Sequence, residues 1–215
     1  MRFLIGNYAL MDIEQSLSAI VLAGGQSTRM GHDKALIVVN GIPLLKRVCQ
    51  VALQCTPEVF VVTRSVDRYQ AIVPPACHLI HESQLPGETT PQGPLVGFAQ
   101  GLAQIRTDWV LLLACDLPNL NAQTLRDWAT LCDRAQEAMA LLPRQNLLAG
   151  WEPLCGFYRT NCFPALQGAI AQGERSFQRW LRSLTIQELA VPNPGMLLNC
   201  NTPADLWRVK SVDGS

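Results

Sequence analysis

A short apolar run near the start of the chain is followed by two adjacent glycines and then by two cations. The run spans residues 19–22, the glycines are Gly24 and Gly25, and the cations are Arg29 and Lys34. The run predicts a buried strand, and the glycines leave the backbone open to close approach by a ligand. Exposed amides beside two positive charges are typical of a polyphosphate site. An ordinary strand-to-helix turn is the alternative, but the two cations favour the polyphosphate.

Two common glycine motifs do not fit this stretch. The P-loop requires a lysine directly after a glycine, and no lysine in the chain follows a glycine. The dinucleotide fingerprint requires Gly-x-Gly-x-x-Gly and a later acidic residue for the ribose. Here the glycines are adjacent, and the second expected strand ends in Val61, Val62 and Thr63 without an acid. The loop therefore differs from both motifs.

Expected strands and helices alternate along the chain, which predicts a three-layer α/β fold with a mostly parallel, Rossmann-like sheet. Strands are expected at 19–22, 59–63, 78–81, 109–114, 138–142, 154–158 and 186–191, with an extended segment at 196–199. Helices are expected at 43–54, 93–105, 122–136, 163–171 and 176–183, with a closing helix from 202. The run 109–114 is the most apolar and should be a central strand.

Composition restricts the class of protein further. A chain of 215 residues suits one domain, which we expect at 17–215. We expect residues 1–16 to form a flexible extension, within which Met11 is an alternative start of translation. Seventeen basic and seventeen acidic residues give zero net charge, which argues against a nucleic-acid partner. No apolar run is long enough for a membrane span, and the N-terminus is a poor signal peptide, so we expect a cytoplasmic protein. Eight cysteines without a Cys-x-x-Cys pair predict buried, reduced thiols.

Asp116 lies just past the end of the expected central strand. Open α/β sheets bind ligands at the carboxyl ends of their strands, and the glycine loop follows the first strand at the same edge. A carboxylate that faces a polyphosphate there is suited to Mg²⁺, which takes one or two protein carboxylates together with phosphate oxygens and water. The alternative is that Asp116 caps the turn through Pro118. The glycine loop favours the metal role.

Lys34 and Arg29 are the candidates for electrostatic catalysis. When a nucleophile attacks the α-phosphate of a nucleotide, negative charge grows on the departing pyrophosphate, and a fixed ammonium and guanidinium stabilise that charge. Solvated surface charges are the alternative for both. A phosphate nucleophile has its second pKa near ~6 and needs no catalytic base. This fits a chain without a serine-hydrolase motif or an activated cysteine signature.

The stretch around the glycines resembles the nucleotidyltransferase signature Leu-Ala-Gly-Gly-x-x-x-Arg-Met-Gly-x-Asp-Lys, and it is most similar to the molybdenum cofactor guanylyltransferases. The resemblance implies that Leu22, Ala23, Gly24 and Gly25 bind the nucleotide and that Lys34 contacts its phosphates. The segment 115–118 is similar to the Cys-Asp-x-Pro pattern of that family, whose aspartate binds Mg²⁺ and the nucleotide. The segments 93–97 and 199–203 resemble its Gly-Pro-Leu-Ala-Gly and Asn-x-Asn-Thr-Pro motifs.

This resemblance implies a reaction and a set of partners. The expected reaction transfers GMP from Mg-GTP to the phosphate of molybdenum-molybdopterin and releases pyrophosphate. Cofactor-delivery proteins and molybdoenzyme chaperones are further candidate partners. Two alternatives stay open: a nucleotidyltransferase of the same fold that uses CTP or a sugar phosphate, and a non-catalytic GTP-binding chaperone.

Further binding residues follow from position and resemblance together. Thr63 and Glu82 end the second and third expected strands, where the family usually has asparagine and aspartate. A carboxylate at Glu82 could accept hydrogen bonds from guanine or ribose, or it could be a solvated loop acid. Gly93 begins a helix whose free amides could meet the nucleotide. For the acceptor, the candidates are Arg175, Asn199 and Asn201, with helix capping as the alternative for Asn201.

Overall fold

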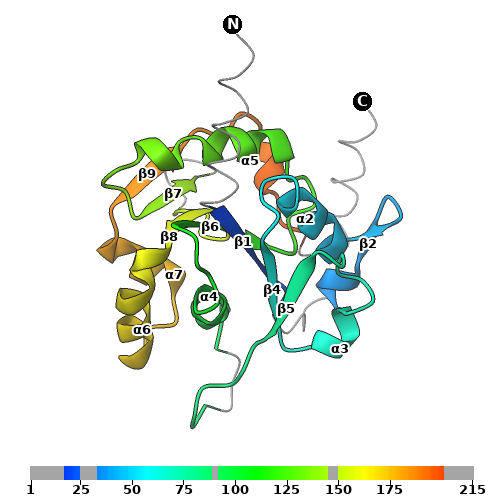
Figure 1. Cartoon of the computed structure of the whole chain (residues 1–215), viewed down its shortest axis with the longest axis horizontal. Coiled ribbons are helices and arrows are strands. Elements are labelled where there is room, and N and C mark those ends of the chain that lie inside the picture. The colour runs from blue at the N-terminus through cyan, green and yellow to red at the C-terminus, as the bar shows by residue number, and fades with distance from the viewer. Residues whose placement is uncertain (1–16, 25–32, 89–91, 145–149, 201–215) are drawn as a thin grey trace, which may run out of the picture.

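The computed structural model of the chain describes residues 17–24, 33–88, 92–144 and 150–200. These residues form one seven-stranded sheet in the order β5-β4-β1-β6-β8-β7-β9 (Figure 1). Its strands are β1 (Leu17–Leu22), β4 (Val59–Thr63), β5 (Cys77–His81), β6 (Trp109–Ala114), β7 (Ala140–Pro143), β8 (Cys155–Arg159) and β9 (Ile186–Leu189). The apolar strand β6 is the central strand, as its composition predicts.

The sheet is mostly parallel, with one antiparallel strand. β1 pairs in parallel with β4 and β6, β4 pairs in parallel with β5, and β7 pairs in parallel with β9. β8 runs antiparallel to both β6 and β7. The register places Leu22 opposite Ala114, so the residues that follow β1 and β6 lie at the same edge of the sheet.

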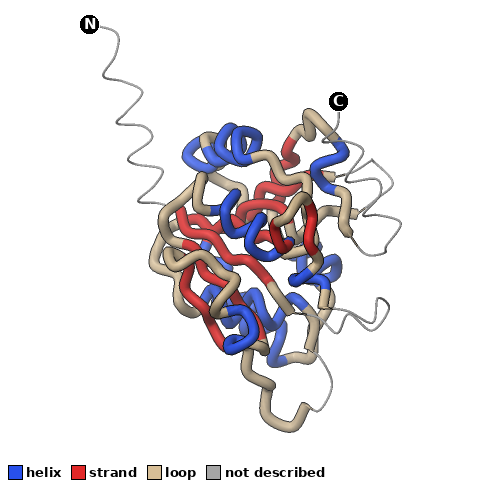
Figure 2. The backbone as a smooth tube through the Cα atoms, turned by 90° about the vertical axis from the view of Figure 1, so that its right-hand side faces the viewer, coloured by secondary structure: helices blue, strands red, loops and turns tan. Residues whose placement is uncertain are grey.

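Helices cover both faces of the sheet (Figures 1 and 2). The helices are α2 (Leu44–Ala52), α3 (Val66–Tyr69), α4 (Pro94–Leu102), α5 (Ala122–Ala129), α6 (Phe163–Ala171) and α7 (Phe177–Trp180). Side chains of β1 alternate between two buried clusters: Ala19 and Val21 pack with α2 and α5, while Ile20 and Leu22 pack with α4 and α6. This alternation of apolar side chains to both faces is expected of a fully buried strand.

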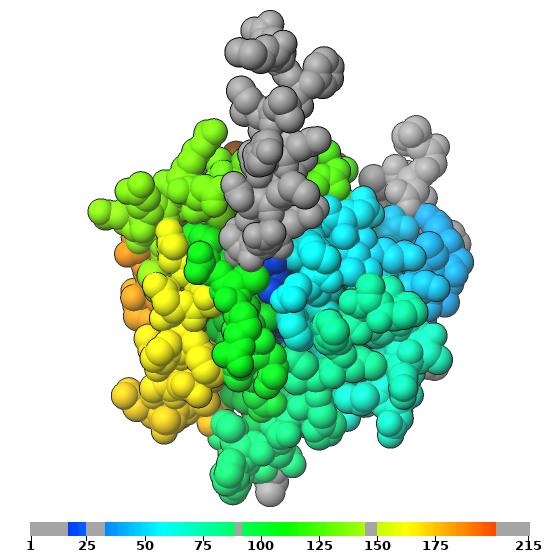
Figure 3. All heavy atoms as spheres, viewed as in Figure 1, coloured from blue at the N-terminus to red at the C-terminus, as the bar shows by residue number. Residues whose placement is uncertain are grey.

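Glycine lets α4 pack closely on the sheet. A Cβ atom at Gly101 would lie 2.8 Å from Cδ1 of Ile20 and 3.0 Å from Cγ2 of Val62. On the face shown in Figure 3, α4 lies beside α6, and the segment 82–88 projects from the lower edge of the molecule. The close packing of α4 fixes the position of its first residues, which matter for the site described below.

Some element boundaries differ from the expectations. The expected extended segment at 196–199 is wrong over its first residues, because Pro194–Leu197 form a 3₁₀ turn whose cap, Asn193, accepts a hydrogen bond from the amide of Gly195 at 2.9 Å. Before α2, where no strand was expected, β2 (Val38–Val39) follows a 3₁₀ turn at Lys34–Leu36 and forms a hairpin with β3 (Ile42–Pro43). The expected extension at 1–16 and the closing helix from 202 lie outside the described residues.

Two predictions from composition can be compared with the structure. All eight cysteines lie in the described ranges and are free, and all but the partly exposed Cys77 are buried, which confirms the prediction of buried thiols. In the part of the chain that the structure describes, no helix combines the length and the apolar character needed to cross a membrane.

Candidate active site

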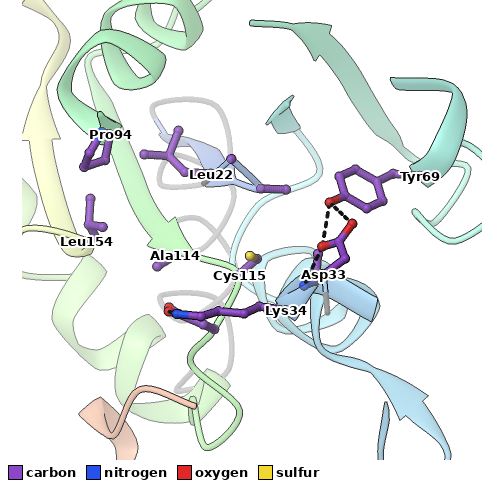
Figure 4. Close-up of a pocket in the computed structure, with 12 residues that line it drawn as sticks. Leu22, Asp33, Lys34, Tyr69, Pro94, Ala114, Cys115 and Leu154 are labelled. Carbon is purple, nitrogen blue, oxygen red and sulfur yellow. Dashed lines mark hydrogen bonds and ion pairs between the residues drawn. The ribbon is translucent and has the colours of Figure 1, made fainter. Parts of the chain in front are cut away.

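A cavity of about 190 Å³ opens where β1 and β6 end. Its lining comes from the ends of these two strands, from the turn at 33–35, from the first residue of α4 and from the last residue of α3 (Figure 4). Five of the predicted site residues line it: Leu22, Ala23, Gly24, Lys34 and Asp116. The fold therefore brings together Gly24 and the acid that the sequence places almost a hundred residues apart.

Lys34 and Asp116 face each other in this cavity. The ammonium nitrogen of Lys34 lies 3.7 Å from Oδ2 of Asp116, and the two side chains are 25% and 20% exposed. Lys34 begins a 3₁₀ turn and extends past Cys115 toward the end of β6 (Figure 4). Burial raises the pKa of the Asp116 carboxyl, and the charge of Lys34 and a backbone hydrogen bond oppose that increase only in part.

The backbone around Asp116 is held by hydrogen bonds from three parts of the chain. The amide of Cys115 donates to the carbonyl of Leu22 at 3.2 Å, and the amide of Cys200 donates to the carbonyl of Asp116 at 2.8 Å. The Nε of Arg47 donates to the carbonyl of Pro118 at 2.6 Å. These hydrogen bonds hold the backbone of Asp116 in place. The bond from Cys200 also brings the segment that contains Asn199 beside the cavity.

Glu82 lies against Gly24. Its side chain is 10% exposed, and a Cβ atom at Gly24 would lie 2.8 Å from its Oε2. Burial raises the pKa of the Glu82 carboxyl, while the nearby Arg64, whose Nε lies 3.9 Å from Oε2, lowers it. The hydroxyl of Thr63 accepts a hydrogen bond from the amide of Ser65 at 3.1 Å and is buried. Among the described residues, neither Thr63 nor Glu82 lines the cavity itself.

The remaining predicted residues lie around the cavity or outside the described ranges. Gly93 has a φ of 75° and precedes Pro94, which lines the cavity. Arg175 forms an ion pair with Glu88 and donates to the carbonyls of Ile170 and Glu174 at 2.8 and 2.7 Å. Asn199 is exposed. The predicted residues outside the described ranges are Gly25, Arg29 and Asn201.

Asp33 and Tyr69 are among the lining residues that were not predicted. Asp33 caps the turn that begins at Lys34, and Tyr69 donates a hydrogen bond to Asp33. Asp33 directly precedes Lys34, and aspartate is a common cap residue, so the sequence could have indicated that Asp33 caps a turn beginning at Lys34. Tyr69 has no local signal, because only the pairing of β4 beside β1 brings α3 to this loop.

The donor set for a cation is small. In the described ranges, no three or more His, Cys, Asp or Glu side chains form a group that could hold a metal ion. Two described carboxylates line this cavity: Asp33 is bonded to Tyr69 and Arg68, and Asp116 faces Lys34, which makes Asp116 the candidate ligand. A single carboxylate suits Mg²⁺ when the other ligands are phosphate oxygens and waters, so these residues fit a metal that arrives with a nucleotide.

Comparisons with known proteins agree with this geometry. A family model described as MobA-like NTP transferase domain matches residues 19–189. A probable molybdenum cofactor guanylyltransferase from Trichormus variabilis is 54% identical over 192 residues, which cover 89% of each chain. The solved structure of molybdopterin-guanine dinucleotide biosynthesis protein A from Archaeoglobus fulgidus superposes with a TM-score of 0.74 at 22% identity, over 91% of this chain and 98% of that one. A Mycobacterium tuberculosis structure with a TM-score of 0.64 and 18% identity, over 91% of this chain and 98% of that one, is a complex with manganese.

Proposed function

The chain belongs to the molybdenum cofactor guanylyltransferases within the MobA-like NTP transferase family, and we propose that it transfers GMP from Mg-GTP to the phosphate of molybdenum-molybdopterin. The observation that carries this proposal is the pair of Lys34 and Asp116, 3.7 Å apart in a cavity that Gly24 also lines. A cation and a carboxylate in one cavity beside open backbone suit a nucleotide that arrives with a divalent metal.

In the proposed reaction, an oxygen of the acceptor phosphate attacks the α-phosphorus of GTP. A new phosphorus–oxygen bond forms while the bond from the α-phosphorus to the bridging β-phosphate oxygen breaks, and that electron pair leaves with pyrophosphate. Most of the acceptor is already a dianion at neutral pH because the second pKa of a phosphate monoester is near ~6. Catalysis then consists of alignment and charge stabilisation. Lys34 stabilises the charge that develops on pyrophosphate.

Asp116 is the residue proposed to hold Mg²⁺. When bound, the metal would neutralise part of the charge of the triphosphate. Asp116 must be ionised for this role. Burial opposes ionisation and Lys34 favours it, and a bound cation would favour it further. The manganese complex of the Mycobacterium tuberculosis protein concerns that protein, and it supports the choice of a divalent cation only through the shared fold.

The other proposed contacts divide between the two substrates. Glu82 lies against Gly24, where an ionised carboxylate could accept hydrogen bonds from the amino and ring N–H groups of guanine. For the acceptor, we propose Arg175 and Asn199. Asn199 adjoins Cys200, whose amide is bonded to the carbonyl of Asp116. Thr63, Gly93, Gly25, Arg29 and Asn201 keep the roles that the resemblance implies.

The test is pyrophosphate release from GTP and Mg²⁺ in the presence and absence of molybdenum-molybdopterin. We expect release only with the acceptor, together with formation of its guanine dinucleotide. A panel with CTP in place of GTP checks the base, and faster turnover with CTP would reject the guanylyl assignment. Binding of GTP without any pyrophosphate release would instead identify a non-catalytic chaperone.

A further inference from the structure

Asp33 is the centre of a hydrogen-bond cluster at the wall of the cavity. The hydroxyl of Tyr69 lies 2.9 Å from Oδ1 and 2.8 Å from Oδ2 of Asp33 (Figure 4). Arg68 contributes its Nη1 at 3.0 Å from Oδ2, and the amide of Ala35 donates to Oδ1 at 3.1 Å. Asp33 thereby joins α3, which follows β4, to the turn that begins at Lys34.

The hydrogen bonds that Asp33 accepts from Arg68 and Tyr69 differ in strength. The side chain of Arg68 is 59% exposed, and exposed ion pairs contribute little because water screens them. Tyr69 is 4% exposed, so its hydrogen bond to a carboxylate is sheltered from competing water. Burial, followed by the hydrogen bond to Asp33, raises the pKa of Tyr69, so the hydroxyl keeps the proton that it donates at neutral pH.

The turn held by this cluster is short. It spans Lys34–Leu36, and its cap is the Asp33 side chain that also accepts from Tyr69. A turn of three residues has little rigidity of its own, so the direction of the Lys34 side chain depends on what fixes Asp33. The ammonium of Lys34 must be placed accurately, because a misplacement of 1 Å at a reacting centre can reduce the rate by about 100-fold.

We infer that Tyr69 is a positioning residue for phosphoryl chemistry, which acts through Asp33 to hold the Lys34 ammonium at the place where the departing pyrophosphate develops its charge. This inference rests on the proposed function, because it assigns to Lys34 the pyrophosphate end of the nucleotide. The alternative is that Tyr69 only stabilises the fold. The two possibilities differ in one respect: positioning requires Lys34, whereas a purely structural role does not.

A double-mutant cycle separates these roles. Tyr69→Phe keeps the buried ring and removes the hydroxyl, and Lys34→Ala removes the group that is positioned. Isothermal titration calorimetry measures the Kd for inorganic pyrophosphate with Mg²⁺, and pyrophosphate release measures kcat where the variant turns over. We expect Tyr69→Phe alone to weaken pyrophosphate binding and to lower kcat by about 10-fold each. In the Lys34→Ala background, the same change should alter pyrophosphate binding less than about 2-fold.

Equal effects of Tyr69→Phe in both backgrounds would overturn the inference, as would no effect in either. Tyr158→Phe is the matched control: it removes a buried hydroxyl that donates to the carbonyl of Pro153 at 2.7 Å, and we expect a lower Tm with unchanged pyrophosphate affinity. If Tyr69→Phe does not fold, Asp33→Asn tests the same coupling. Because pyrophosphate binding is measured without GTP or acceptor, coupling there together with no guanylyl transfer would reject only the proposed function.

Discussion

The α-carbon of Gly24 lies so close to the carboxylate of Glu82 that a methyl group on it would come within 2.8 Å of Oε2. Gly97 on α4 borders the same carboxyl group, since a Cβ atom there would lie 3.7 Å from its Cδ atom. Glycine at position 24 leaves the space that Glu82 occupies, whereas the distance at position 97 is an ordinary van der Waals contact. Gly24 therefore accommodates a buried acid and also lines the cavity.

Gly24→Ala should displace the Glu82 carboxylate. We expect weaker binding of Mg-GTP and a loss of at most about 1 kcal/mol in the free energy of unfolding, because the added methyl group meets the end of a side chain that can move aside. Adding Glu82→Asp shortens the acid by one methylene and should restore part of both losses. Chemical denaturation and calorimetric titration of the single and double variants measure this. If the loss of stability in the double variant equals the sum of the losses in the two single variants, the contact between Gly24 and Glu82 is contradicted.

Lys34→Met should lower kcat for pyrophosphate release by about 100-fold or more, because it removes a charge aimed at the transition state. The fold should be retained, since methionine keeps most of the length of the side chain. Lys46→Met is the control, since Lys46 lies on the exposed face of α2 and its loss should change neither kcat nor KM. Equal rates for the Lys34 variant and the wild type would remove Lys34 from the mechanism.

Asp116→Asn should abolish turnover and raise Tm at neutral pH. Burial raises the pKa of the Asp116 carboxyl in the folded protein, so the unfolded chain loses its proton at a lower pH than the folded chain. The wild type therefore loses stability as pH rises from the unfolded pKa to the raised folded pKa, and the loss is constant above it. The asparagine variant lacks this loss.

The measurement is Tm for both proteins from about pH 4 to about pH 8 without metal. The difference in Tm should grow with pH in favour of the variant and then become constant. Mg²⁺ with GTP should stabilise the wild type alone and more strongly as pH rises, because the cation requires the ionised carboxylate. A variant that turns over normally would exclude Asp116 as the metal ligand.

The sheet edge that carries the site could be predicted from the sequence, and several contacts could not. Strand β6 has the predicted bounds. The position of Asp116 just after it could also be predicted, because an apolar run that ends close to a polar residue is visible in the local sequence. β8 lies antiparallel between β6 and β7, and no local pattern encodes that order. Tyr69 meets Asp33 only through the tertiary fold, so its place in the cavity had no sequence signal.

Arg175→Ala should raise KM for the acceptor without changing the affinity for Mg-GTP. In the structure, the Arg175 guanidinium is paired with Glu88, so an acceptor phosphate would compete with that carboxylate. Glu88→Gln breaks the same ion pair and leaves Arg175 in place, and it should not raise the acceptor KM. Steady-state kinetics with each substrate varied in turn measures both. Equal increases of the acceptor KM in the two variants would show that acceptor binding depends on the ion pair and not on a contact between Arg175 and the phosphate.

The most direct measurement is a crystal structure of the protein with Mg²⁺ and a GTP analogue whose α,β-bridge cannot be cleaved. The account predicts a triphosphate along the glycine loop, with its β- and γ-phosphates at Lys34 and one metal ligand from Asp116. The base should lie toward Glu82. A nucleotide bound at the hollow formed by Glu174 and Arg179, or anywhere else away from Gly24 and Asp116, would contradict it.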